Sequence, residues 1–268
     1  MPNTIFNSDT VPSIKILGAY GGKATNMQLT SLQISKEIAI DAGNLVEGLG
    51  NGIKNINHIF VTHAHLDHIL DIGFLIDATF ASRVTPLKVY AQKANLDLIK
   101  EHIFNWEIWP DFTEINLHNS DKKAIELIEI KINETVNIDG CILKAVKNNH
   151  TKSSNGYVIQ KVDHALLFTS DTYCCDHLWE EVNNNLSIST VIIDVSFPSK
   201  LEQLALDSKH LTPKLLKDEL KKLKRDDVII HINHIKPFCK NEVIEEVIKS
   251  DLLLNGGTIL EAQDVVEF

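Results

Sequence analysis

The sequence has few cysteines and no long apolar run, and both absences exclude classes of protein. Its four cysteines are Cys141, Cys174, Cys175 and Cys239, of which two are adjacent and hard to bridge with ordinary disulfide geometry. We therefore expect reduced thiols and a cytoplasmic protein. The N-terminus has no basic stretch followed by an apolar one, so we expect no signal peptide. No apolar segment approaches the ~20 residues that span a bilayer, so we expect no membrane partner.

Positive charge is also scarce. The chain has 26 basic and 36 acidic residues among 268, a formal net charge of -10. This balance makes nucleic acid an unlikely partner, because binding to phosphates favours a basic surface. It leaves a small anionic substrate open, because bound metal can reverse the local sign of charge. Repeats, low-complexity segments and Pro/Gly/Ser-rich linkers are lacking, so we expect residues 1–268 to form a single domain.

Apolar runs and turn signals predict an α/β fold. Strands come first in each half of the chain and helices later, which favours two mixed β-sheets packed together with helices outside, a four-layer αββα sandwich. Helices are expected from near His68, over Ala94–Phe104, from Thr212-Pro213 and over Glu242–Lys249. The expected strands are Ser13–Gly18, Leu32–Ser35, Ile38–Ile40, His58–Thr62, Leu87–Ala91, Ile125–Ile132, Cys141–Val146, Gly156–Val162, Ala165–Phe168, Thr190–Val195, Val228–Ile232 and Thr258–Glu261.

The most informative segment is His63-Ala64-His65-Leu66-Asp67-His68, directly after an apolar strand. Zinc in proteins is bound by imidazole, carboxylate and thiolate groups, and this segment offers the first two. His63 and His65 are two residues apart, so in an extended segment their side chains project from the same side. Asp67 and His68 lie further on, at the expected start of a helix, and can reach a second metal. Four such groups packed together indicate a metal site rather than a polar loop.

Further ligands are expected where other strands end. His150 follows the strand Cys141–Val146, Asp171 follows Ala165–Phe168, and His234 follows Val228–Ile232. Such strand ends are where α/β sites collect their residues. His231 competes with His234, but it lies inside the strand, so we favour His234. Cys174 and Cys175 lie near Asp171 and are interpreted as small buried residues rather than as soft ligands.

These motifs resemble the metallo-β-lactamase-fold hydrolases. The form His65-Leu66-Asp67-His68 resembles, more particularly, the bacterial branch of the class II 3′,5′-cyclic-nucleotide phosphodiesterases. Most of the chain takes part in the resemblance, through the segments Phe104–Phe112, Val195–Pro198, His210–Pro213 and His234–Pro237. One departure is Ser170, which stands where the family often has Gly before its Asp.

The resemblance implies two zinc ions, with manganese and iron as alternatives. It places His63, His65 and His150 on one ion. By the same resemblance, the other ion is held by Asp67, His68 and His234, and Asp171 bridges the two. It assigns catalytic roles to Asp67, to Asp41 as an acidic residue that steadies the site, and to His210 as the group that protonates the leaving oxygen. From the sequence alone, Asp41 as a strand-end turn residue and His210 as a residue preceding a helix remain equally open.

The activity implied is hydrolysis of a 3′,5′-cyclic nucleotide, cAMP or cGMP, to the nucleoside 5′-monophosphate by a hydroxide that bridges the two metals. Trp106, Trp109 or Tyr20 could stack on the base, or could be core aromatics. Gly21-Gly22 could line the phosphate pocket. Dimerisation is common in the fold, so a homodimer stays open.

Three other functions remain open. A ribonuclease Z-like tRNA 3′-endonuclease shares every ligand, but such enzymes often carry a long arm between the residues that match His150 and Asp171. Here only residues 151–170 separate the two. Another hydrolase of this fold is the second alternative. A non-catalytic metal or nucleotide sensor is the third, and the complete ligand set disfavours it.

Overall fold

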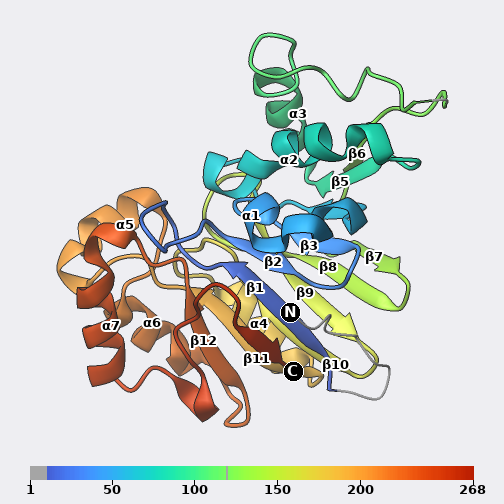
Figure 1. Cartoon of the computed structure of the whole chain (residues 1–268). Coiled ribbons are helices and arrows are strands. Elements are labelled where there is room, and N and C mark those ends of the chain that lie inside the picture. Colours follow the sequence, from blue (N-terminus) through green and yellow to red (C-terminus); the bar gives the residue numbers. More distant parts are fainter. Residues whose placement is uncertain (1–10, 119) are drawn as a thin grey trace.

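The computed structural model describes residues 11–118 and 120–268, which form two mixed β-sheets packed face to face (Figure 1). The first sheet consists of β1 (Ser13–Gly18), β2 (Ser31–Gln33), β3 (Ile38–Ile40), β4 (His58–Phe60), β5 (Leu87–Ala91), β6 (Ile125–Glu129) and β13 (Val265–Glu267). Its strands lie in the order β13-β1-β2-β3-β4-β5-β6. The pairs from β3 to β6 are parallel, and those from β13 to β3 are antiparallel.

The second sheet has the order β12-β11-β10-β9-β8-β7. It consists of β7 (Thr135–Ile138), β8 (Cys141–Lys147), β9 (Asn155–Lys161), β10 (His164–Phe168), β11 (Ile188–Asp194) and β12 (Ile229–Asn233). β10, β11 and β12 are parallel, and β8 runs in the same direction because β9 is antiparallel to both β8 and β10. The last residues of β8, β10, β11 and β12 therefore lie at one edge of the sheet.

Helices cover the two outer faces, and Figure 1 shows α1–α3 and α5–α7 on opposite sides of the sheets. The helices are α1 (Leu45–Leu49), α2 (Leu66–Thr79), α3 (Lys93–His102), α4 (Asp176–Asn184), α5 (Glu202–Ser208), α6 (Pro213–Glu219) and α7 (Lys240–Lys249). Short 3-10 helices are η1 (Gly50–Asn55), η2 (Phe80–Ser82), η3 (Ser199–Leu201), η4 (Leu220–Lys222), η5 (Pro237–Cys239) and η6 (Leu254–Gly256). Within the described residues, no helix is both long and apolar enough to cross a membrane.

Alternating side chains produce the layers. In β1, Ile16 points into the core between the sheets, while its neighbour Leu17 packs towards α1 and α2. In β4, Phe60 faces the same inter-sheet core, where it contacts Tyr157 of β9 at 5.6 Å between ring centroids. A third core lies between the second sheet and α4–α7. This alternation confirms the predicted four-layer αββα sandwich, because each sheet buries both of its faces.

Two expectations about individual elements are corrected. The last strand is β13 rather than Thr258–Glu261, which makes only one bridge to β12, between Ile259 and Ile232, before the chain crosses to β1. The helices α1, α4 and α5, which are short helices of five, nine and seven residues, are also absent from the predicted elements. Thr212 does cap α6 as predicted, because its side-chain oxygen accepts a hydrogen bond from Leu215 N.

Candidate metal centre

The segment His63–His68, with the pattern HxHxDH, forms the turn from β4 into α2. The chain leaves β4 at Phe60, and His65 is the N-cap residue of α2, where its carbonyl accepts a hydrogen bond from His68 N at 3.0 Å. His63 and His65 precede the helix, and Asp67 and His68 lie in its first turn. The strand-to-helix turn therefore aims all four side chains at the same edge of the sheets.

The other predicted ligands come from the second sheet and reach the same edge. His150 follows β8, Asp171 follows β10 and His234 follows β12. Left-handed backbone turns the chain at two of these strand ends, with a φ of 55° at Ser170 and 63° at His234. The position before Asp171 thus adopts a conformation that favours glycine, although this chain has serine there.

The first cluster consists of His63, His65, His150 and Asp171, whose ligand atoms all lie within 4.8 Å of one another. His150 Nε2 is 3.2 Å from His65 Nδ1. Asp171 Oδ2 is 3.6 Å from His63 Nε2 and 3.8 Å from His150 Nε2. These are the spacings of groups that converge on one point between them.

The second cluster consists of Asp67, His68 and His234. Nε2 of His68 and Nε2 of His234 are 3.4 Å apart, and Asp67 Oδ2 is 3.6 Å from His234 Nε2. Asp171 lies beside this cluster too, with Oδ2 at 3.3 Å from His68 Nε2 and Oδ1 at 3.1 Å from His234 Nε2. Asp171 therefore lies between the two clusters, where a bridging ligand would have to be.

Outer partners fix how the imidazole rings face the centre. In four of the clustered histidines, Nδ1 lies within hydrogen-bond distance of a polar atom outside the two clusters. These atoms are Thr62 Oγ1 for His63 (3.0 Å), Asp41 Oδ2 for His68 (2.7 Å), Lys209 O for His150 (3.0 Å) and Ser196 Oγ for His234 (3.1 Å). In all four the Nε2 atom is left to face the centre. Such partners are typical of metal-binding histidines, whose tautomer and ring orientation they hold.

Two buried atoms test whether this donor set fits metal ions. His63 Nε2 and Asp171 Oδ1 have no hydrogen-bond partner among the described residues, although both side chains are buried. Unpaired buried polar atoms are costly, and cations placed between the converging imidazole and carboxylate atoms would satisfy them. Five imidazoles and two carboxylates suit zinc, and manganese and iron are compatible with the same atoms.

The electrostatics of these side chains agree with this fit at four of the five histidines. The exception is His68: burial acts to lower its pKa, but the carboxylates of Asp171 and Asp41 raise the pKa well above its ordinary value. Burial lowers the pKa of His63, His65 and His234, and that of His150 to about 4, so these rings are neutral and able to bind a cation at neutral pH. For Asp171, burial acts to raise the pKa, but the positive charge that His234 and His68 carry when protonated outweighs burial and holds the pKa well below its ordinary value. The ligand roles of these residues nevertheless stay predictions.

Asp41 and His210 both lie beside the clusters. Asp41 is fully buried and accepts hydrogen bonds from Thr62 N at 2.8 Å and from His68 Nδ1. Its pKa is raised by burial, against the effects of His68 and Thr62. His210 forms a third group with Asp171 and His234, within 4.8 Å. Burial acts to lower the pKa of His210, but the carboxylate of Asp194, 2.7 Å from its Nδ1, raises the pKa above its ordinary value.

Two residues that support the site, Asp194 and Ser196, are not among the predicted site residues. Asp194 ends β11 and contacts both His210 Nδ1 and, at 2.6 Å, the hydroxyl of Ser196. It had been included in an apolar strand, and its position as the carboxylate at a strand end is the signal that could have identified it. Ser196 in turn meets His234 Nδ1.

The remaining candidate residues differ in how they lie relative to the centre. His231 Nδ1 meets Thr258, and neither Cys174 nor Cys175 belongs to a metal-binding group of the described residues. Tyr20 is buried and donates to Glu261, whereas Trp106 is 62% exposed. Gly21 lies directly against the His234 ring, since a Cβ added to it would be 2.5 Å from His234 Cε1.

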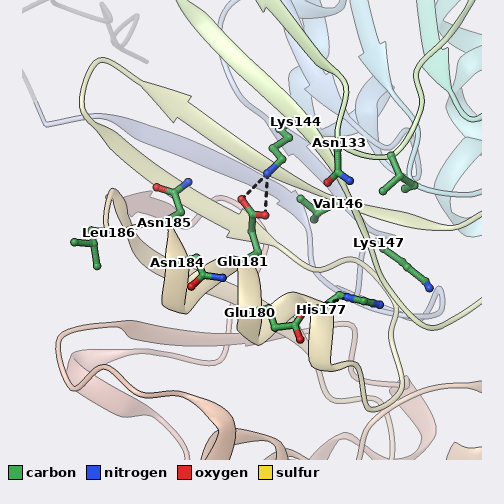
Figure 2. A pocket seen from close by; sticks show the side chains of 11 residues that line it. Asn133, Lys144, Val146, Lys147, His177, Glu180, Glu181, Asn184, Asn185 and Leu186 are labelled. Carbon is green, nitrogen blue, oxygen red and sulfur yellow. Dashed lines mark hydrogen bonds and ion pairs between the residues drawn. The ribbon is translucent and has the colours of Figure 1, made fainter.

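A separate groove of about 710 Å³ lies between β8 and α4. Figure 2 shows its central ion pair, in which Lys144 Nζ donates to both carboxylate oxygens of Glu181, at 2.9 and 2.8 Å. None of the clustered histidines or aspartates lines this groove. It is therefore not the cleft of the candidate metal centre.

A model of a known protein family matches most of the chain. The family model described as anti-Pycsar protein Apyc1 matches residues 22–223, which include all seven predicted ligands except His234 and contain both Asp41 and His210. The chain belongs to the Apyc1 family. The Apyc1 family match thus covers the HxHxDH segment and the later strand ends at His150 and Asp171.

The curated relatives of the chain carry two kinds of name. A protein of Yersinia pestis named probable 3′,5′-cyclic-nucleotide phosphodiesterase is 23% identical over 302 aligned residues, which cover 93% of this chain and 86% of the relative. A ribonuclease Z of Methanosarcina acetivorans is 28% identical over 109 residues, which cover 40% of this chain and 32% of the relative. A second ribonuclease Z, from Methanococcus aeolicus, is 24% identical and covers 80% of this chain and 81% of the relative. The phosphodiesterase match extends over more of both chains than either of these.

Solved structures define the fold of this Apyc1-family chain. The metallo-β-lactamase fold protein YhfI from Bacillus subtilis matches with a TM-score of 0.74 and 17% identity, covering 95% of this chain and 99% of that one. Unliganded yeast PDE1 matches with a TM-score of 0.75 and 18% identity, covering 97% and 100%. The fold is that of the metallo-β-lactamases, as the motif resemblance predicted.

Proposed function

We propose that this chain is a binuclear metal-dependent phosphodiesterase that hydrolyses 3′,5′-cyclic nucleotides to nucleoside 5′-monophosphates. The observation that carries the proposal is the pair of ligand clusters with the carboxylate of Asp171 between them. The relative named as a cyclic-nucleotide phosphodiesterase, which aligns with 93% of the chain, supports the choice of substrate. We further propose that the whole chain acts as one hydrolase domain.

In this proposal, His63, His65 and His150 hold one ion, Asp67, His68 and His234 hold the other, and Asp171 contacts both. When bound, two such ions supply a water of lowered pKa and positive charge that stabilises the phosphoryl oxygens. The protein contributes the orientation of the ligands: Asp41 accepts from His68 Nδ1, and Lys209 O accepts from His150 Nδ1. Both contacts keep Nε2 of each ring directed at the centre.

Hydrolysis of the cyclic diester forms one phosphorus–oxygen bond from water and breaks the bond to the 3′ oxygen, which must gain a proton. We assign the delivery of that proton to His210. Its Nδ1 is 2.7 Å from Asp194 Oδ2, an arrangement that leaves Nε2 free to donate and stabilises the charged ring. His210 also lies within 4.8 Å of atoms of Asp171 and His234, close to where the substrate phosphate would be.

Ribonuclease Z activity is the second candidate, because relatives of that name match the chain, one over 40% of its length and another over 80%. Two observations count against it. Residues 151–170, between His150 and Asp171, are occupied by β9, β10 and their connections, and the chain carries a net charge of -10. The segment therefore leaves no room for the long arm that ribonuclease Z enzymes often carry there, and the negative net charge does not favour binding of a large polyanion.

A hydrolysis screen tests the proposal. Metal-loaded protein would be incubated with cAMP, cGMP, an aryl phosphodiester and precursor tRNA, with the Asp67→Ala variant as control. We expect cleavage of a cyclic nucleotide and of the aryl diester, and loss of both activities in Asp67→Ala. Cleavage of precursor tRNA alone would support the second candidate. Cleavage of neither the cyclic nucleotides nor the aryl diester would refute the phosphodiesterase assignment.

A further inference from the structure

The hydroxyl of Thr62 is the meeting point of three buried groups beside the metal centre. Thr62 Oγ1 is 2.9 Å from Asp41 Oδ2, 3.0 Å from His63 Nδ1 and 2.9 Å from Ser170 Oγ. Thr62, Asp41 and His63 are 0% exposed and Ser170 is 1% exposed. With so little exposure, the hydroxyl has to satisfy these neighbours itself.

Counting protons determines the direction of each hydrogen bond. A hydroxyl has one proton to donate and two lone pairs to accept with. Asp41 already accepts from Thr62 N and faces His68 Nδ1, so its carboxylate acts as an acceptor throughout, and the Thr62 proton goes to it. The two remaining lone pairs then face His63 Nδ1 and Ser170 Oγ, and both of these atoms must donate.

The proton on His63 Nδ1 has a direct consequence for the other ring nitrogen. A neutral imidazole carries one proton, so Nε2 of His63 is bare. This is the atom that has no hydrogen-bond partner among the described residues and lies 3.6 Å from Asp171 Oδ2. Thr62 therefore selects the tautomer of His63 that can bind a cation through Nε2.

Ser170 extends the same link across the molecule. Thr62 follows β4 in the first sheet, whereas Ser170 follows β10 in the second sheet. Each directly precedes a predicted ligand, His63 and Asp171. A hydrogen bond between the two hydroxyls thus ties one strand end of each sheet together at the residue before each ligand.

We propose that Thr62 and Ser170 are positioning residues, whose linked hydroxyls select the His63 tautomer and hold His63 and Asp171 in register across the two sheets. This proposal rests on the proposed metal site but not on the identity of the substrate. Substituting such outer partners of metal ligands typically costs 10- to 100-fold in metal affinity.

The tautomer can be read directly in metal-free protein labelled with ¹⁵N-histidine, by long-range ¹H–¹⁵N NMR, with the His63 signal assigned by its loss in His63→Gln. We expect the Nδ1-protonated form in the unmodified chain and in Thr62→Ser, which keeps the hydroxyl. We expect Thr62→Val to lose this preference and to bind zinc about 10- to 100-fold more weakly in a chelator competition.

Thr190→Val is the matched control, because Thr190 is equally buried in β11 and its hydroxyl has no hydrogen-bond partner among the described residues. It should leave both readouts unchanged. Ser170→Gly provides a second test if Thr62→Val fails to fold, since glycine suits the left-handed backbone there. It removes one hydrogen bond, so we expect zinc binding to weaken about 5-fold.

An unchanged His63 tautomer and unchanged zinc affinity in Thr62→Val, or unchanged affinity in Ser170→Gly, would overturn the proposal. These outcomes are distinct from failure of the proposed function. A protein that shows the expected tautomer and zinc affinities, yet cleaves no cyclic nucleotide, would refute the substrate assignment and leave the positioning roles intact.

Discussion

At the scale of single residues, His210 is the group whose role can be separated from metal binding. Its Nδ1 meets Asp194, and it lies beside Asp171 and His234 without being one of the seven predicted ligands. If it protonates the leaving 3′ oxygen, its importance depends on the leaving group. An alkoxide needs that proton, whereas an aryl oxide leaves without it.

Replacing His210 by alanine should therefore lower kcat for a cyclic nucleotide by about 10²- to 10⁴-fold, and for an aryl phosphodiester by much less. Because Asp194 raises the pKa of His210, activity on the cyclic nucleotide should persist above pH 6.5 and fall as the pH rises through that raised pKa. Steady-state kinetics on both substrates, with metal content measured by elemental analysis, check this. Loss of one metal ion in His210→Ala would instead make His210 a ligand.

At the scale of secondary-structure elements, the loop after β1 lies directly against His234 of the candidate metal centre. A Cβ added to Gly21 would be 2.5 Å from Cε1 and 2.6 Å from Nδ1 of His234, and 2.8 Å from the His234 carbonyl oxygen. Gly21 N also donates to Ile235 O, and Lys236 Nζ donates to Gly21 O. The loop therefore cannot move away without breaking its own contacts to the segment that follows β12.

Gly21→Ala should displace the His234 ring and lower the metal content of the purified protein towards one ion per chain. Gly52→Ala is a suitable control, because its added Cβ would meet only Leu49 Cβ, at 3.7 Å. Elemental analysis after dialysis against a fixed zinc concentration measures the effect. Two ions in Gly21→Ala, as in Gly52→Ala, would show that the loop does not fix His234.

Elements differed in how far the sequence predicted them. Strands such as β1 and β3 were predicted with their observed ends, because apolar alternation and turn residues mark them locally. The helices α1 and α5 were missed, since at five and seven residues they are too short to show a helical period. Asp194 could have been named as a candidate from its place at the end of β11, but only tertiary contact shows that Asp194 holds His210 and that Ser196 holds His234. His150 and Asp171 were predicted as ligands from their place after apolar runs, and the structure brings them within 4.8 Å of His63.

At the scale of the whole molecule, the candidate metal centre lies between two sheets that already share an extensive core. His63, His65, Asp67 and His68 belong to the first half of the fold, and the remaining ligands follow strands of the second sheet. Bound ions would therefore crosslink the sheets. The apolar core between them includes Ile16, Phe60 and Tyr157, and it is independent of those ligands.

Removing the metal with a chelator should thus destabilise the protein without unfolding it. At free zinc 100-fold above the dissociation constant, binding to the folded state alone adds about 2.7 kcal/mol to the free energy of unfolding for each ion bound. Denaturant unfolding with zinc and with chelator measures this difference, and the Asp67→Ala variant should show a smaller one. An unfolded far-UV spectrum in chelator would contradict the view that the apolar cores alone maintain the fold.

The two ligand clusters are proposed to form one hydrolytic site for a 3′,5′-cyclic phosphodiester. The zinc-loaded protein, incubated with cAMP and with cGMP in H₂¹⁸O, tests this directly when the products are identified by mass spectrometry. We expect a nucleoside 5′-monophosphate that carries one ¹⁸O atom on phosphorus. Recovery of both cyclic nucleotides intact, or formation of a 3′-monophosphate, would contradict it.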